Sequence, residues 1–160
     1  MNSEKQQTLQ VAALTVLRIL IGWHFLYEGL AKMMKPDWSA AGFLIESKWI
    51  FAPVFQWMAD NPKVLDVVDF LNIWGLTAIG LALILGIFTR SAGVAGMGLI
   101  LLYYICNPPF VGLHYSLPME GNYLIVNKNL VEMAALFVVA VMPGSRSVGL
   151  DRIIDKLWKK

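Results

Sequence analysis

The chain has 160 residues, of which 58% are hydrophobic and 15% are charged. Soluble domains carry about 25% charged residues, and a soluble fold of this length has too small an interior to bury so much apolar surface. A net charge of +2 is too small for a nucleic-acid-binding surface, and a single cysteine excludes an internal disulfide. The composition therefore predicts an integral membrane protein, and the length predicts one domain over residues 1–160.

Four apolar stretches are candidates for helices that cross the membrane, which takes about 20 residues for about 30 Å of hydrocarbon. They cover approximately residues 9–34, 70–88, 92–107 and 124–142. The third stretch is short and ends at Pro108 and Pro109, which cannot continue a helix. The second and third are separated only by residues 89–91, so they form an antiparallel hairpin. We expect an all-α, four-helix membrane bundle.

The segment between the first two spans contains apolar residues at helical spacing over approximately residues 40–59. These apolar residues are Phe43, Ile50, Phe51, Val54, Phe55 and Met58. Pro53 interrupts the pattern. The pattern predicts an interfacial or re-entrant amphipathic helix that lies over the outer mouth of the bundle. An ordinary extracytoplasmic loop with some apolar packing is the alternative.

The positive charges favour one orientation, because Lys and Arg are enriched in short cytoplasmic segments. With four spans, the N-terminal tail, the hairpin loop and the C-terminal tail lie on one side. Their cationic residues are Lys5, Arg90, Arg146, Arg152, Lys156, Lys159 and Lys160. The longer loop on the other side mixes its lysines with acidic residues (Lys35, Lys48 and Lys63 with Asp37, Glu46, Asp60 and Asp66). Both termini are therefore predicted to be cytoplasmic.

Charged side chains inside the spans point to a shared polar site, since each costs about 2.5–3.5 kcal/mol on insertion scales and needs a partner. His24, Glu28 and Lys32 are four residues apart and form one stripe on the first helix. With the termini inside, Glu28 and Glu132 lie at similar depths in the outer half of the bilayer. The other polar or aromatic residues expected at this level are Asn72, Trp74, Tyr103, Tyr104, Asn127, Lys128 and Asn129.

The charges in this cluster can neutralise one another, for example Glu28 with Lys128 and Glu132 with Lys32. We interpret the cluster as a polar, aromatic-lined pocket that suits the head group of a quinone, an isoprenoid or another lipid. A quinone ring would stack on Trp or Tyr, and Glu28, Glu132 or His24 would handle protons. No ligand set has the spacing of a metal site. The alternative is an aromatic girdle with two ion pairs that only fix the helix register.

The order of short motifs resembles the DoxX family of small four-helix bacterial membrane proteins. Arg18, Gly22, Gly29 and Lys32 give the pattern RxxxGxxxxxxGxxK on the first helix. The other matching residues are Gly80, Gly86, Thr89, Arg90, Asn127, Lys128, Asn129, Glu132, Gly149, Leu150 and Asp151. The resemblance implies a multi-pass protein of the bacterial inner membrane, related to the small subunit of thiosulfate:quinone oxidoreductase. It also implies quinone association, with Arg18, Lys32, Lys128 and Glu132 as the matching positions.

Our first hypothesis is that the chain is a quinone- or lipid-binding subunit of a redox assembly. Whether it is catalytic alone stays open. The second hypothesis is a non-catalytic membrane scaffold that binds partner proteins, and the third is a carrier of a lipid or small solute. The expected partners are membrane lipid, a quinone, a redox protein and further copies of the chain, with no nucleic acid.

Overall fold

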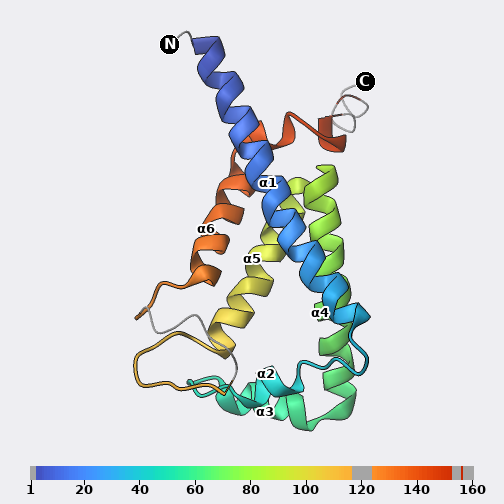
Figure 1. The fold of residues 1–160 in the computed structure, drawn as a ribbon, viewed down its shortest axis with the longest axis vertical. Helices are drawn as coiled ribbons and strands as arrows, with labels where there is room; N and C mark the ends of the chain where they lie inside the picture. Colours follow the sequence, from blue (N-terminus) through green and yellow to red (C-terminus); the bar gives the residue numbers. More distant parts are fainter. Residues whose placement is uncertain (1–2, 117–123, 153–155, 157–160) are drawn as a thin grey trace.

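The structure is a computed structural model that describes residues 3–116, 124–152 and 156, and this part of the chain is helical without any strand. The helices are α1 (Ser3–Met34), α2 (Ala41–Ile45), α3 (Ala52–Asp60), α4 (Pro62–Leu85), α5 (Thr89–Cys106), α6 (Lys128–Val141) and the short 3-10 helix η1 (Pro143–Arg146) (Figure 1). Three of them, α1, α4 and α5, are long and apolar enough to cross a membrane. Lys159 and Lys160 lie outside the described residues.

The spans differ from the predicted ones mainly at their polar ends. Helix α4 begins at Pro62, eight residues before the predicted start. A proline is favourable in the first turn of a helix. The predicted start was later because it was placed at the beginning of the apolar run. Helix α6 has 14 residues and a length of about 21 Å, which is shorter than the predicted span of residues 124–142. It starts at Lys128 because the Asn127 side chain caps it, accepting a hydrogen bond from the Leu130 amide at 3.2 Å.

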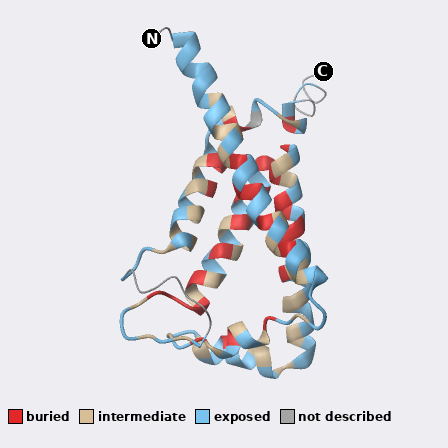
Figure 2. Cartoon of the chain, viewed as in Figure 1, coloured by how far each residue is buried: buried red, intermediate tan, exposed pale blue. Residues whose placement is uncertain are grey.

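The core lies where α1, α4 and α5 meet and where α6 packs on α5 (Figure 2). Helices α1 and α4 approach so closely that their backbones touch. A Cβ on Gly29 would lie 2.8 Å from the Thr77 nitrogen, and a Cβ on Gly80 would lie 2.7 Å from the Gly22 carbonyl oxygen. Glycine is required at this crossing, as expected where small residues let helices pack in lipid.

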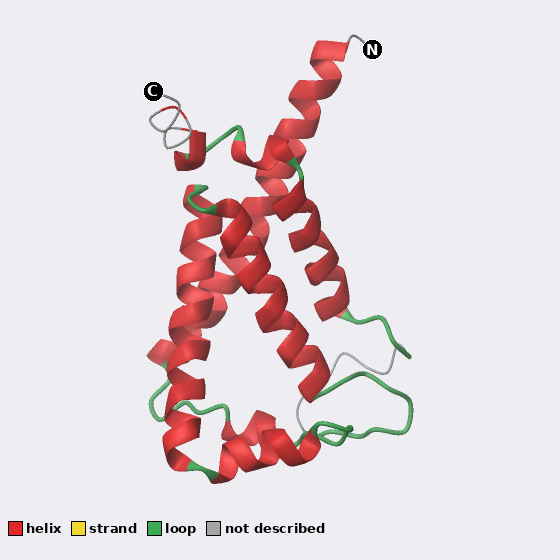
Figure 3. Cartoon of the chain, turned by 180° about the vertical axis from the view of Figure 1, so that it is seen from behind, coloured by secondary structure: helices red, strands yellow, loops and turns green. Residues whose placement is uncertain are grey.

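Helices α2 and α3 cover the end of the molecule opposite the start of α1, which we call the pocket end (Figures 1 and 3). The single helix predicted over residues 40–59 is wrong in detail, because residues 46–51 separate two short helices. Pro53 lies in the first turn of α3, where its missing N–H costs nothing. Asn107 of the α5 C-cap donates to the Phe43 carbonyl at 3.1 Å, and Ser47 donates to the Cys106 carbonyl at 2.7 Å. These bonds hold α2 against the end of α5.

The other end, which we call the terminal end, contains the start of α1, η1 and residues 147–152 (Figure 1). Arg18 of α1 is 1% exposed, and its guanidinium donates to the carbonyl oxygens of Ser145 at 2.6 Å and Val148 at 2.7 Å. The carboxylate of Asp151 accepts the amides of Phe88 at 2.8 Å and Thr89 at 2.9 Å. The segment after α6 is therefore joined both to α1 and to the N-terminus of α5.

Candidate functional site

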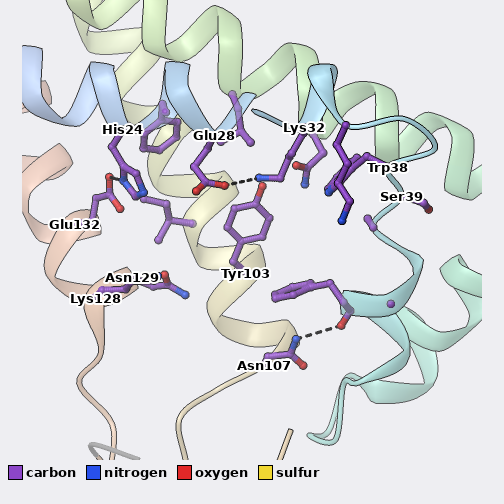
Figure 4. A pocket seen from close by; sticks show the side chains of 18 of the residues that line it. His24, Glu28, Lys32, Trp38, Ser39, Tyr103, Asn107, Lys128, Asn129 and Glu132 are labelled. Carbon is purple, nitrogen blue, oxygen red and sulfur yellow. Dashed lines mark hydrogen bonds and ion pairs between the residues drawn. The ribbon is translucent and has the colours of Figure 1, made fainter. Parts of the chain in front are cut away.

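A pocket of about 640 Å³ lies at the pocket end, between α1, α4, α5 and α6 and beneath the segment that contains α2 (Figure 4). This volume falls within the range of about 300–1,000 Å³ that is typical of small-molecule sites. Phe25, Leu76 and Ile100 supply apolar lining. The polar and charged lining residues are His24, Glu28, Lys32, Lys35, Asp37, Ser39, Asn72, Tyr103, Asn107, Asn127, Lys128, Asn129 and Glu132.

A histidine–carboxylate hydrogen bond and an ion pair lie in the pocket wall. His24 Nδ1 lies 2.7 Å from Glu132 Oε1 and so joins α1 to α6, while Lys32 Nζ lies 2.9 Å from Glu28 Oε2 along α1 (Figure 4). The predicted pairing of Glu132 with Lys32 is therefore wrong. The helical spacing of four residues places Lys32 beside Glu28, so Glu132 meets the shorter His24 side chain from the facing helix.

The pairing of His24 with Glu132 leaves one imidazole nitrogen for a ligand. When Glu132 is ionised it accepts the hydrogen on Nδ1, so Nε2 of the neutral ring has a free lone pair. The His24 side chain is 47% exposed and that of Glu132 is 16% exposed, so the imidazole is accessible while its partner is held in the wall. This arrangement can accept a proton from a bound hydroxyl group.

The formal charge of the lining is balanced. Three lysines (Lys32, Lys35 and Lys128) and three carboxylates (Glu28, Asp37 and Glu132) line the pocket. The Lys32 ammonium also lies 5.5 Å from the centre of the Trp38 ring, within the range of a cation–π contact. With neutral His24 the six charges sum to zero, which favours a neutral polar ligand over a highly charged one.

Nine of the twelve residues proposed from the sequence line this pocket, and the other three do not. Arg18 lies toward the terminal end, where backbone carbonyls bind its guanidinium. Trp74 is 52% exposed and packs beside Phe70 on α4. The Tyr104 hydroxyl donates to the Ile125 carbonyl at 2.8 Å and so positions the chain that leads into α6. Trp74 and Tyr104 were expected at the level of the pocket, and they do not line it.

Sequence reasoning missed the lining residues at the end of α1 and around α2, among them Lys35, Asp37, Trp38 and Ser39. The sequence did contain a signal for these residues, because the segment over residues 40–59 was predicted to lie over the mouth of the bundle. The residues that connect the first helix to this segment could therefore have been included in the predicted pocket lining. Asn107 was also missed, since only its contact with the distant Phe43 identifies its position. No cluster suited to a metal ion occurs among the described residues.

The fold and the pocket define a helical membrane protein with a charged, ligand-sized cavity at one end. The family model for DoxX matches residues 13–106, which is more than half of the chain, so the chain belongs to the DoxX family. The match begins within α1 and ends with α5, whereas the motif residues of α6 and the C-terminal segment lie outside it. No curated protein and no solved structure gave a match.

Proposed function

We propose that this DoxX-family protein binds the neutral head group of a quinone or similar lipid in the pocket, as the membrane subunit of a redox assembly. The observation that carries the proposal is the His24–Glu132 pair, which presents an accessible imidazole to a cavity lined both by apolar residues and by charges that balance. A lipid-tailed ring needs this combination, since its ring is apolar and its oxygens exchange protons.

The proposal includes a role for each ion pair. His24 accepts a proton from a ligand hydroxyl through Nε2, and Glu132 stabilises the imidazolium that results. Glu28 and Lys32 form a pair without net charge on the next turn of α1, and their individual charged groups orient the ligand oxygens. The apolar Phe25, Leu76 and Ile100 contact the ring faces.

We further propose that residues 1–160 form one domain that crosses the bacterial inner membrane four times, with both termini in the cytoplasm. The start of α1 and residues 147–152 lie at the same end of the molecule (Figure 1), as an even number of crossings requires. Helix α6 is too short to cross 30 Å as a regular helix, so residues 124–127, which form a turn and the cap of α6, would complete the fourth crossing. The pocket would then face the periplasmic half of the bilayer.

The experiment that tests the function is purification from native membranes in a mild detergent, followed by mass spectrometry of the co-extracted lipids and proteins. We expect a quinone or another neutral-headed lipid at a near-stoichiometric ratio, and its loss from Glu132→Gln. A protein that co-purifies tightly without any such lipid would instead support the scaffold hypothesis.

A further inference from the structure

The polar side chains of α1 that line the pocket beside α6 are only half buried. His24 joins α1 to α6 through Glu132, and beyond this hydrogen bond the two helices diverge toward the pocket end (Figures 1 and 3). The side chain of His24 is 47% exposed, and that of Glu28, one turn nearer the pocket end, is 46% exposed. Across the gap, Lys128 at the start of α6 also lines the pocket and is exposed. Because His24 lies about 15 Å along the helix axis from the end of α1 at Met34, the pocket is open at the side of the bundle.

The surface beside this side opening is apolar on both helices. On α1, Leu20 lies one turn before His24 on the same stripe and is 62% exposed, and Tyr27 is 61% exposed. On α6, Val131 directly precedes Glu132 and is 61% exposed. A hydrocarbon chain that leaves the pocket through the side opening therefore meets apolar side chains of α1 and of α6.

The pocket also reaches the surface at the pocket end, where its edge has a different chemistry. Lys35, Asp37, Ser39 and Gly42 line the pocket there and are exposed. A hydrocarbon chain that crossed this edge would displace water from charged groups without offering them hydrogen bonds, which is unfavourable. The two edges therefore suit different parts of one ligand, and only the side opening suits an apolar chain.

We propose that the ligand carries a hydrocarbon tail and that this tail leaves the pocket between α1 and α6 into the bilayer. The head group then covers the exposed sides of His24 and Glu28, which would otherwise face hydrocarbon at an unfavourable free energy. A ligand held in this way exchanges with the bilayer directly, without passing through water. This inference rests on the proposed function, and it adds the route of the tail and the requirement that the ligand has one.

The test locates the tail on the full wild-type chain in phosphatidylcholine nanodiscs. The probe is a benzoquinone whose decyl tail ends in a diazirine, a group that inserts into nearby C–H bonds when it is illuminated. Mass spectrometry of the digested protein identifies the labelled residues, with and without an excess of decyl-tailed benzoquinone that lacks the diazirine. We expect label at Val131 on α6 and around Leu20 and Tyr27 on α1, and we expect the excess competitor to remove it.

Val67 of α4 is the matched control site, because it is also a valine, is 56% exposed and does not line the pocket. Label that reaches Val67 from free probe in the bilayer should be the same with and without the competitor. Competitor-sensitive label at Val67 or at residues 35–42, in place of the α1 and α6 positions, overturns the inference alone. If the competitor removes no label from any part of the chain, the proposed function is overturned and the inference with it.

Discussion

The carboxylate of Glu132 has two roles, because it joins α6 to α1 and also orients the His24 imidazole. Glu132→Gln keeps the size of the side chain but removes its charge. We predict that this variant lowers the amount of ligand recovered per protein about tenfold. The loss of a charge-assisted hydrogen bond of about 1.4 kcal/mol corresponds to this factor. The melting temperature should change little, because the pair is partly exposed and solvent screens it. Mass spectrometry and a thermal melt in detergent measure the two effects.

Glu4→Gln is a suitable control for that variant, because Glu4 lies in the exposed first turn of α1 and far from the pocket. It should match the wild type in both measurements. A Glu132→Gln protein that retains its ligand would show that the carboxylate serves only to connect the two helices.

Asp151 has a different role at the terminal end, where both carboxylate oxygens accept amides at the start of α5. Its charge is also favourable beside the positive end of the helix dipole. We predict that Asp151→Asn lowers the free energy of unfolding by about 1–2 kcal/mol, because an amide keeps one acceptor and loses the charge. A thermal melt with Asp60→Asn as the control measures the change, and equal melting temperatures for the two variants would contradict a capping role.

The residue-level site was predictable where the helix period alone determines the neighbours. His24, Glu28 and Lys32 are four apart, so their common stripe follows from the sequence. The binding partner of Arg18 could not be found in this way, because Ser145 and Val148 are more than 120 residues away and present only backbone oxygens. A backbone acceptor has no sequence signature.

At the scale of elements, the closest packing is the crossing of α1 and α4. A methyl group on Gly80 would overlap the backbone of α1, whereas a methyl group on Gly75 of the same helix would meet nothing within 4 Å. We predict that Gly80→Ala lowers the free energy of unfolding by about 1–3 kcal/mol, the usual cost of overpacking. Gly75→Ala should be neutral or slightly stabilising, since alanine is a better helix former. Thermal melts of the two variants provide the comparison, and equal stabilities would show that the helices can separate at no cost.

The loop after α5 is joined to the residues after α2 by Glu46. The Ser116 amide donates to the Glu46 carboxylate at 3.0 Å, and this bond, with a smaller contribution from Lys48 at 3.5 Å, holds the pKa of Glu46 below its usual range. A lowered pKa means that the carboxylate stabilises the folded loop above the unfolded pKa of about 4.3. This stabilisation is lost as the pH falls through the folded pKa.

We therefore predict that protection of the Ser116 amide from hydrogen exchange, corrected for the intrinsic rate, decreases at pH values below about 4. Glu46→Gln should show weak protection that does not change over the same range, because its amide does not titrate there. Protection that stays constant with pH in the wild type would mean that the carboxylate does not hold the loop.

The sequence predicted the type of each element better than it predicted the residues at which the element begins and ends. Long apolar runs identified α1, α4 and α5, since few other structures satisfy the backbone of such a sequence in lipid. The start of α6 was misplaced because Leu124, Ile125 and Val126 continue the apolar run, although the cap at Asn127 begins the helix later. The break between α2 and α3 depends on Ser47 and Gln56, whose side chains bond to backbone oxygens.

At the scale of the whole molecule, the two ends differ in what their polar side chains contact. The terminal end fixes the helices through Arg18 and Asp151, whose polar groups bind backbone amides and carbonyls. At the pocket end, by contrast, charged side chains face a cavity. The hydrogen bonds of the terminal end therefore join the helices to one another, while the charged groups of the pocket end are available to a ligand.

The proposed topology makes a prediction for the whole chain that labelling can test. Cys106 is the single cysteine, so Cys106→Ala gives a background for new cysteines at the exposed positions Lys5, Lys63 and Arg152. In intact cells with a permeabilised outer membrane, a membrane-impermeant maleimide should react with Lys63→Cys alone. Lys5→Cys and Arg152→Cys should react only after the inner membrane is lysed, because four crossings return the chain to the cytoplasm. If Arg152→Cys reacts together with Lys63→Cys, α6 does not complete a crossing and the chain spans the membrane three times.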